Sequence, residues 1–101
     1  MSPTKDPNMR EKDVEQALTQ AVKKAGGISL KLVSPGTAGI PDRLILLRGG
    51  KAGFIEVKAP GQKPRALQMA RLHQLQHQGF TATWIDHPAQ IQDVLHAIQT
   101  S

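Results

Sequence analysis

The sequence predicts a small α/β domain in which a mixed β-sheet is flanked by helices, with the element order αβββαβα. Three observations lead to this fold class. Apolar residues recur at helical spacing in three segments, four short β-type runs separate them, and glycine or proline marks the junctions. With 101 residues the chain has the length of one domain. We expect a disordered, polar N-terminal tail over residues 1–9 and a single domain over residues 10–101.

The first helix is predicted to open at Glu11 and to end at Gly26-Gly27. Its apolar positions follow the spacing of one buried face: Val14, Ala17, Leu18, Ala21, Val22 and Ala25. A glycine ends such a helix well because it readily takes the positive φ that a helix C-terminus often needs. Residues 28–32 then alternate between apolar and polar, which predicts a half-exposed strand.

A β-hairpin is predicted next, followed by two further helices and one strand. Residues 44–47 form a short apolar run, residues 48–51 a Gly-Gly turn, and residues 52–58 the returning strand. A second helix over residues 65–78 ends at Gly79, and residues 81–85 are typical of a fourth strand. Asp86 or His87 caps the last helix, whose apolar stripe is Ile91, Val94, Leu95 and Ile98.

Two carboxylates and a lysine meet at one end of this hairpin. Because strand side chains alternate, Glu56 and Lys58 project from one face of the returning strand. Antiparallel pairing brings Asp42, at the start of the first strand, beside them. Two nearby carboxylates repel each other and hold a hard divalent cation well. A lysine beside them can orient water or neutralise a phosphate, so the arrangement is typical of phosphodiester cleavage.

The spacing of these residues resembles the motif of the PD-(D/E)xK nuclease superfamily, with a 13-residue gap between Pro41-Asp42 and Glu56-Val57-Lys58. The resemblance extends over roughly residues 10–98. It includes, in order, the helix opened by Glu11, Ser34-Pro35-Gly36, Gly39-Ile40-Pro41-Asp42-Arg43, Pro60-Gly61, Pro64 and Leu67-Gln68. Taken together, the chain resembles a stand-alone VRR-NUC domain of the phage type, similar to Holliday-junction resolvases. This implies a restriction-endonuclease-like core and metal-dependent cleavage of branched or double-stranded DNA.

The resemblance implies a role for each residue of the motif. Asp42, Glu56 and the Val57 backbone carbonyl would hold one or two Mg²⁺ or Mn²⁺ ions. Lys58 would position the attacking water, help deprotonate it, and offset charge on the phosphate.

Glu15 and Gln68 lie on helices at positions that fit either a structural or a functional role, and the resemblance implies the functional one. Glu15 lies at the edge of the apolar stripe, where an ordinary solvated glutamate is the simpler interpretation. The family has a glutamate in this helix that contributes to the metal site, and Glu11 is a weaker candidate for the same place. Gln68 shares a helix face with Leu72 and Leu75, so it should point inward and be hydrogen-bonded. The resemblance implies that it orients Lys58 or the attacking water.

The composition favours a nucleic-acid partner. There are 13 Lys+Arg against 8 Asp+Glu, giving a formal net charge of +5 and a pI near 10.0. Charge alone fits a merely soluble basic protein equally well. Contacts between basic side chains and DNA phosphates would give affinity and register but no base specificity. The candidate DNA-binding residues are Lys31, Arg43, Arg48, Lys51, Lys63 and Arg65, which together with Arg71 cluster in and around the half of the chain that carries the motif.

Other functions are less consistent with the sequence. His73 and His77 have the spacing of a helical zinc pair, but no cysteine or Glu-x-x-His supplies a further ligand. A non-catalytic DNA-binding module would usually have lost an acidic ligand or the lysine. A sequence-specific restriction enzyme would need a base-reading insertion for which 101 residues leave little room.

Location and assembly are also expectations at this stage. No stretch approaches the roughly 18 apolar residues of a membrane span, and no signal peptide is visible, which favours the cytoplasm of a bacterial or infected host cell. The resemblance to resolvases implies a homodimer, because a junction has two scissile strands and this chain has one site. The final strand or a helix with an exposed Leu67 are candidate contact surfaces.

Overall fold

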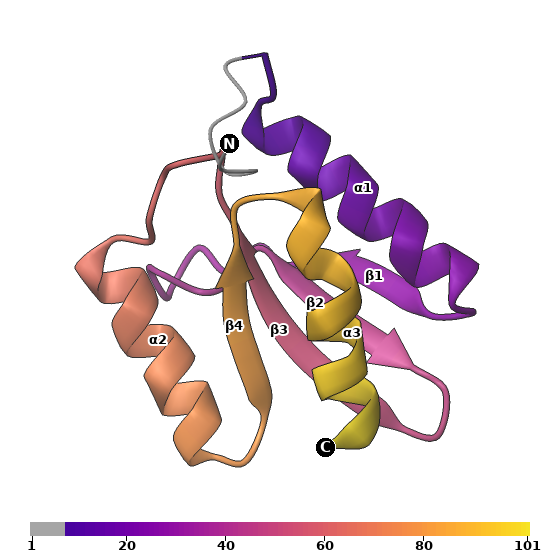
Figure 1. The fold of residues 1–101 in the computed structure, drawn as a ribbon. Helices are drawn as coiled ribbons and strands as arrows, with labels where there is room; N and C mark the ends of the chain where they lie inside the picture. The colour runs from indigo at the N-terminus through magenta and orange to yellow at the C-terminus, as the bar shows by residue number, and fades with distance from the viewer. Residues whose placement is uncertain (1–7) are drawn as a thin grey trace.

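The chain folds as predicted in element order. The fold is seen in a computed structural model, which describes residues 8–101. Its elements are α1 (Glu11–Lys24), β1 (Ile28–Lys31), β2 (Arg43–Leu47), β3 (Lys51–Val57), α2 (Ala66–His77), β4 (Thr81–Ile85), a 3-10 turn (Pro88–Gln90) and α3 (Ile91–Thr100) (Figure 1). The mixed sheet and the order αβββαβα are therefore confirmed.

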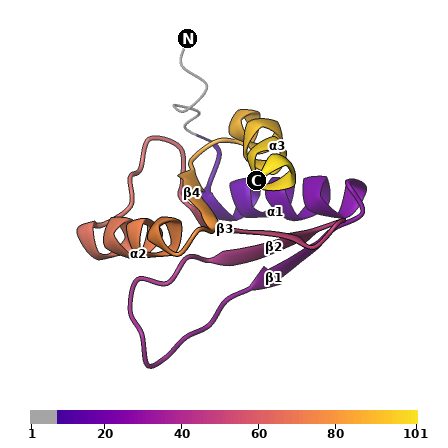
Figure 2. The ribbon, with the colours of Figure 1, turned by 90° about the horizontal axis from the view of Figure 1, so that it is seen from below.

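The four strands form one sheet in the order β1-β2-β3-β4. β1 and β2 pair antiparallel, as do β2 and β3, whereas β3 and β4 run parallel with α2 as the connection between them. Helices α1 and α3 cover one face of the sheet, and α2 lies beside β4 (Figure 2). The opposite face of β1, β2 and β3 carries no helix among the described elements.

The hydrophobic core lies between the sheet and the two helices α1 and α3. Its buried members are Val14, Leu18, Val22, Ile45, Leu47, Ile55, Val57, Ile85, Ile91, Leu95 and Ile98. The predicted stripes of the first and last helices are thus largely confirmed, with Ala17, Ala21 and Val94 partly buried against the core. Ala25 is exposed, because the helix ends at Lys24 and Ala25 is its cap.

Glycine is required at two places in the hairpin. Gly49 and Gly50 both have positive φ, +81° and +73°, which matches the two-residue turn that joins antiparallel strands. Gly53 lies under α3, where an added Cβ would be 2.5 Å from Ile98 Cγ1. The predicted turn is confirmed, and the missing side chain of Gly53 lets α3 approach β3 closely.

The N-terminal tail falls mostly outside the described residues. The prediction of disorder over residues 1–9 concerns residues 1–7, which the structure does not describe, and Asn8 and Met9, which it does. Met9 packs against the core, so the ordered part begins slightly earlier than predicted. Within residues 8–101, no helix has the length and hydropathy needed to cross a membrane.

Candidate active site

Asp42 and Glu56 lie opposite each other at one end of the β2–β3 hairpin. The register pairs Arg43 with Ile55, which places the preceding Asp42 across from the following Glu56. Asp42 Oδ2 accepts a hydrogen bond of 2.9 Å from the backbone N–H of Val57. The loop before β2 is fixed by the fully buried Pro41. The side chain of Asp42 is therefore held against β3 by the backbone of the predicted Glu-x-Lys motif.

Glu56 is a buried carboxylate with one satisfied oxygen and one unsatisfied oxygen. Its side chain is only 2% exposed. Oε2 accepts a hydrogen bond of 2.8 Å from Gln68 Nε2 and lies 3.2 Å from Lys58 Nζ. Oε1 is buried and has no hydrogen-bond partner among the described residues. A buried polar oxygen without a partner is costly, so this atom needs a donor or a cation.

Lys58 shares the face of Glu56. The backbone N–H of Lys58 donates to the Ile85 carbonyl at 2.9 Å, which continues the β3–β4 ladder by one residue. Because the backbone stays paired there, the side chains of Glu56 and Lys58 alternate with that of Val57, which is buried in the core. The predicted grouping of Asp42, Glu56 and Lys58 is what the folded chain brings together.

The electrostatics of the acid pair favour a positive partner. Burial raises the pKa of Glu56 above its ordinary value, and the nearby Asp42 carboxylate raises it further. Lys58, through its hydrogen bond and its charge, and the nearby Asp42 backbone lower the pKa, but they do not cancel the effect of burial. A cation bound between the two carboxylates would favour the ionised form of Glu56.

The donor set fits a hard divalent cation. Asp42 and the unpaired Oε1 of Glu56 would supply oxygen ligands to such a cation, and the Val57 carbonyl belongs to the residue between Glu56 and Lys58. Across the described part of the chain, no group of three or more His, Cys, Asp or Glu side chains gathers around one point. Two carboxylates are compatible with Mg²⁺, which usually keeps several waters and needs only one or two carboxylates.

Gln68 points inward, as predicted, and contacts Glu56. Its Nε2 donates to Glu56, while its Oε1 accepts a hydrogen bond of 2.8 Å from the Arg65 backbone N–H. The side chain therefore ties the start of α2 to the acid pair. Among residues 8–101 no hydrogen bond joins Gln68 to Lys58, so an action on Lys58 itself stays a prediction.

Glu15 lies in a separate polar cluster on the α1 side of the sheet. Its Oε2 is 3.0 Å from Arg43 Nε and 3.2 Å from Lys31 Nζ. Lys31 and Arg43 are register partners on β1 and β2, so both side chains reach the same helix. Within residues 8–101 no contact between Glu15 and the acid pair is recorded. A role for Glu15 in metal coordination stays a prediction.

The predicted DNA-binding residues do not gather in one place. Lys63 and Arg65 are exposed in the loop between β3 and α2, and the Arg65 backbone is linked to Glu56 through Gln68. Arg48 and Lys51 flank the β2–β3 turn, at the opposite end of the hairpin from Asp42. The five residues of β2 separate the two ends by roughly 17 Å. Arg48 and Lys51 therefore lie away from the motif, and the contact of all six residues with DNA stays a prediction.

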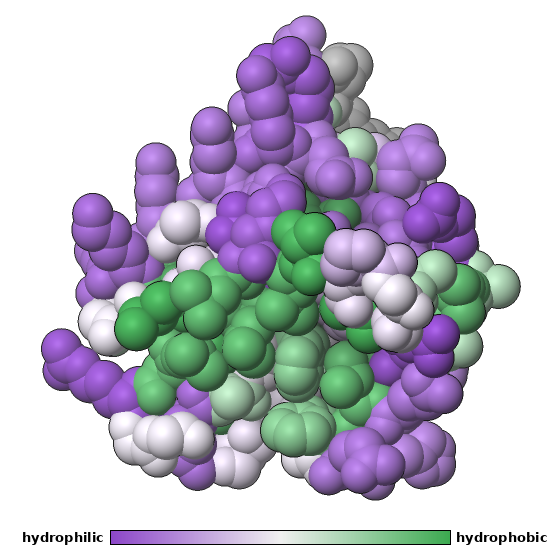
Figure 3. Space-filling view, turned by 180° about the vertical axis from the view of Figure 1, so that it is seen from behind, coloured by the Kyte–Doolittle hydropathy of each residue, from purple (hydrophilic) through white to green (hydrophobic). Residues whose placement is uncertain are grey.

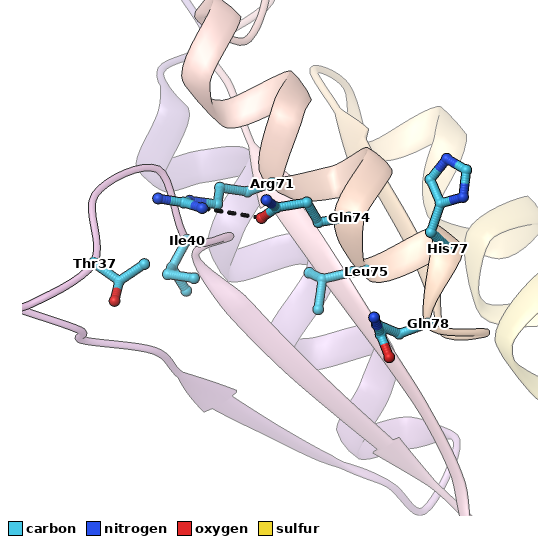
Figure 4. Close-up of a pocket in the computed structure, with 7 residues that line it drawn as sticks. All are labelled: Thr37, Ile40, Arg71, Gln74, Leu75, His77 and Gln78. Atoms are coloured by element: carbon cyan, nitrogen blue, oxygen red, sulfur yellow. Dashed lines mark hydrogen bonds between the residues drawn. The ribbon is translucent and has the colours of Figure 1, made fainter.

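Arg71 makes two hydrogen bonds that the sequence did not predict. Its Nε donates to the Ala38 carbonyl at 2.9 Å, and its Nη1 donates to Gln74 Oε1 at 3.0 Å. The first bond holds the loop that precedes Asp42 against α2, and the second lies within α2. A pocket of about 480 Å³ lies between this loop and α2 (Figure 4), and Asp42, Glu56 and Lys58 do not line it. The three-residue spacing from Gln68 was the one available signal, since it places Arg71 on the same helix face.

Asp86 supports the other side of the site. It is 6% exposed, and its Oδ2 accepts a hydrogen bond of 3.2 Å from the Gly61 backbone N–H, which fixes the loop that follows Lys58. Of the two predicted caps, His87 is the one observed: its Nδ1 accepts a hydrogen bond of 3.0 Å from the Ala89 N–H in the 3-10 turn that leads into α3. Asp86 is therefore part of the scaffold around the site rather than the cap.

Comparison with known proteins assigns the chain to a family. No family model matches it. The phage protein named "Putative nuclease p44", from Acyrthosiphon pisum secondary endosymbiont phage 1, is 51% identical over 73 residues, which cover 69% of this chain and 78% of that protein. A solved structure described as a VRR_NUC domain matches with a TM-score of 0.78 and 24% identity, over 85% of this chain and 94% of that one. The chain belongs to the family of this phage protein and has the fold of a VRR-NUC domain.

The VRR-NUC assignment confirms the resemblance inferred from the motif order. The structural match confirms the mixed sheet with helices as a VRR-NUC fold. At 24% identity that match concerns the fold alone, whereas the phage relative, at 51% identity, carries the family assignment. In this VRR-NUC chain the acid pair and Lys58 lie together at the end of β3, where the motif predicted them.

Proposed function

We propose that this protein is a metal-dependent DNA endonuclease whose active site is built on Asp42, Glu56 and Lys58. The observation that carries the proposal is the buried Glu56 carboxylate, which has one oxygen 3.2 Å from Lys58 Nζ and the other without a partner. An ion pair with Lys58 alone would leave the second oxygen of Glu56 buried without a partner, which is energetically costly. Together with membership in a nuclease family, this supports a cation-binding catalytic site.

Each side chain has a distinct task in this mechanism. Asp42, Glu56 and the Val57 carbonyl would hold Mg²⁺ or Mn²⁺. When bound, the ion supplies positive charge at the scissile phosphate and a more acidic water. Lys58 orients the attacking water and offsets the charge that develops on the phosphate. Gln68 keeps the Glu56 carboxylate in place through its 2.8 Å hydrogen bond.

The proposed substrate is branched DNA, and the proposed assembly is a homodimer that acts in the cytoplasm. Support for branched DNA comes from the similarity of the motif order to Holliday-junction resolvases. A four-way junction has two scissile strands, and this chain offers one acid pair. Two copies related by a two-fold axis would provide the second site.

The activity is tested by cleavage of matched duplex, flap and four-way junction DNA, with and without Mg²⁺ or Mn²⁺. We expect Asp42→Asn, Glu56→Gln and Lys58→Ala each to lower the cleavage rate by about 10²-fold or more, as the loss of a catalytic group usually does. Asp93→Asn, at an exposed acid of α3, is the matched control and should cleave normally. Full activity in any of the first three at saturating metal would remove that residue from the mechanism.

The alternative function is a non-catalytic DNA-binding module that retains the fold. It predicts that the wild-type protein binds DNA but cuts none of the three substrates with either metal. The presence of all three residues favours the enzyme, with Lys58 paired to Glu56 and Asp42 held by the Val57 backbone.

A further inference from the structure

The loop that leads to Asp42 has few connections to the rest of the molecule. Residues 33–41 join β1 to Asp42. At the base of the loop, the Leu32 backbone N–H donates to the Asp42 carbonyl at 2.8 Å. Among residues 8–101, one recorded hydrogen bond joins the loop itself to another element, from Arg71 Nε of α2 to the Ala38 carbonyl at 2.9 Å. The position of the loop therefore depends on α2.

The sheet offers the loop no helix to lean on. The loop projects on the side of the sheet that faces away from α1 and α3 (Figure 2). Seen from behind, this side shows uncovered apolar surface across its centre (Figure 3). Ile28 and Leu30 of β1 are 57% and 43% exposed there, and Val33, the first residue of the loop, is 78% exposed. Support for the returning half of the loop comes from α2, which lies beside it (Figure 4).

The loop also lies against α2 at close range. Gly39 has a φ of +80°, and a Cβ added to it would be 2.9 Å from Leu67 Cγ and 3.2 Å from Arg71 Cγ. Glycine permits this approach because it has no side chain and adopts positive φ readily. We call Leu67 and Arg71 the loop seat. The loop is thus held on the seat by one hydrogen bond and by direct packing of its backbone.

A short and restricted segment connects the loop seat to Asp42. Only Ile40 and Pro41 lie between Gly39 and Asp42. Ile40 is half-buried and Pro41 is fully buried. The proline ring also fixes one backbone dihedral angle. A shift of Gly39 along the helix is therefore passed on to the backbone of Asp42 rather than absorbed by a flexible linker.

The same helix holds the other carboxylate. Gln68 lies three residues before Arg71, on the same side of α2, and its Nε2 donates to Glu56 Oε2 at 2.8 Å. Both members of the acid pair are thus connected to one helix, Glu56 directly and Asp42 through the loop. Mg²⁺ demands near-ideal geometry, with oxygens at about 2.0–2.1 Å. The spacing of the two carboxylates is the property that α2 is placed to control.

We propose that Arg71 is a positioning residue for Asp42. By holding Ala38 against α2, it sets where the Asp42 carboxylate lies relative to Glu56. The inference rests on the proposed function for the role of the acid pair in binding a cation. Arg71 is bonded to the protein through two of its nitrogens, since Nε donates to the Ala38 carbonyl and Nη1 to Gln74 Oε1. Its guanidinium is therefore used to hold structure in place.

The first test compares two neighbouring backbone amides in metal-free protein. The Val57 N–H donates to Asp42 Oδ2, and the Lys58 N–H donates to the Ile85 carbonyl, each at 2.9 Å. Arg71→Met keeps the aliphatic stem and removes the donor. We expect hydrogen exchange, followed by NMR, to become about 10-fold faster at Val57 and to stay unchanged at Lys58. A general loss of stability would accelerate both amides alike.

The second test separates positioning from DNA binding. Arg71→Met should lower kcat by about 10-fold or more and raise the Mg²⁺ concentration that gives half-maximal rate, with the KM for DNA unchanged. Loss of a phosphate contact would instead raise KM and reduce the salt dependence of binding. Gln74→Met is the matched control, because it removes the other bond of Arg71 and leaves the bond to Ala38. It should behave as the wild type in both tests.

The outcomes separate this inference from the nuclease proposal. Unchanged exchange at Val57 in Arg71→Met, or equal acceleration at Val57 and Lys58, overturns the positioning role. A raised KM with an unchanged kcat overturns it as well, and leaves the nuclease. Selective acceleration at Val57, in a protein that cuts no DNA with either metal, supports the positioning of Asp42 by Arg71 and overturns the proposed function.

Discussion

Gln68 shows how a single side chain prepares the acid pair. Its amide connects the first turn of α2, through the Arg65 backbone, to the buried carboxylate of Glu56. An amide is suited to this position because it donates and accepts at the same time. The carboxylate is thereby fixed with Oε1 left available, which is the arrangement a cation requires.

Replacing Gln68 tests this positioning role. In Gln68→Leu we expect cleavage to fall by about 10- to 100-fold, because the amide that holds Glu56 is lost. The loss should appear mainly as weaker metal binding, measured by the Mg²⁺ concentration that gives half-maximal rate. Gln92→Leu, at an exposed position of α3, serves as the control. A rate loss with no change in metal dependence would assign Gln68 to another step.

The raised pKa of Glu56 predicts a pH dependence of stability. A carboxyl whose pKa is higher in the folded state binds more protons there than in the unfolded chain, so stability falls as pH rises. The fall begins near the ordinary value of 4.5 and ends once pH exceeds the folded-state pKa. Without metal, Glu56→Gln should therefore melt at a higher temperature than the wild type at roughly neutral pH. At a pH well below 4.5 the two proteins should have the same melting temperature. Thermal melts in metal-free buffer at both pH values would show this.

Added Mg²⁺ provides the complementary measurement. A cation that binds the folded state alone raises its melting temperature. At neutral pH, Mg²⁺ should stabilise the wild type and have little effect on Glu56→Gln. Equal stabilisation of both proteins would show that the ion binds elsewhere.

At the scale of elements, the close approach of α3 to β3 depends on Gly53. An added Cβ there would be 2.5 Å from Ile98, a core residue that is fully buried. Since well-packed interiors accommodate extra atoms poorly, either α3 must shift or strand β3 must bend. Strand β3 leads directly to Glu56 and Lys58, so its geometry matters for the site as well as for the core.

Gly53→Ala should destabilise the protein by about 1–3 kcal/mol through overpacking. Urea denaturation would report this as a lower midpoint with an unchanged slope. Gly36→Ala is the matched control, because nothing lies within 4 Å of a Cβ at that position. It should be neutral or slightly stabilising. A neutral Gly53→Ala would mean that α3 is free to move away from the sheet.

At the scale of the whole molecule, the basic residues divide between the two ends of the hairpin. Lys63 and Arg65 lie in the loop that follows Lys58, whereas Arg48 and Lys51 lie at the far turn. A duplex bound across the site should contact the first pair in every binding mode. It reaches the second pair only if it runs along the length of the hairpin.

Salt-dependent binding distinguishes these arrangements. We expect Lys63→Gln/Arg65→Gln to weaken DNA binding and to reduce the slope of log affinity against log salt by about 1–2. Arg48→Gln/Lys51→Gln removes the same charge and should have a smaller effect. Binding to metal-free protein, followed by fluorescence anisotropy across a salt series, measures both slopes. Equal changes in the two variants would place DNA along the whole hairpin.

The sequence by itself determined the element order, the Gly49-Gly50 turn, and the meeting of Asp42 with Glu56 and Lys58. These features depend on residues that are neighbours in the chain or partners across a short hairpin. Local periodicity and strand alternation are sufficient to predict such contacts. The same reasoning predicted that Gln68 points inward, because helix spacing places it beside Leu72.

Only the tertiary structure decided which atoms Gln68 and Glu15 contact and what covers each face of the sheet. Gln68 reached Glu56, and Glu15 paired with Lys31 and Arg43, because packing of the helices on the sheet sets distances between residues remote in sequence. The outward position of Ile28 has the same cause. Alternation shows that a strand has two faces, but only the packing of α1 and α3 decides which face is buried and which is left exposed.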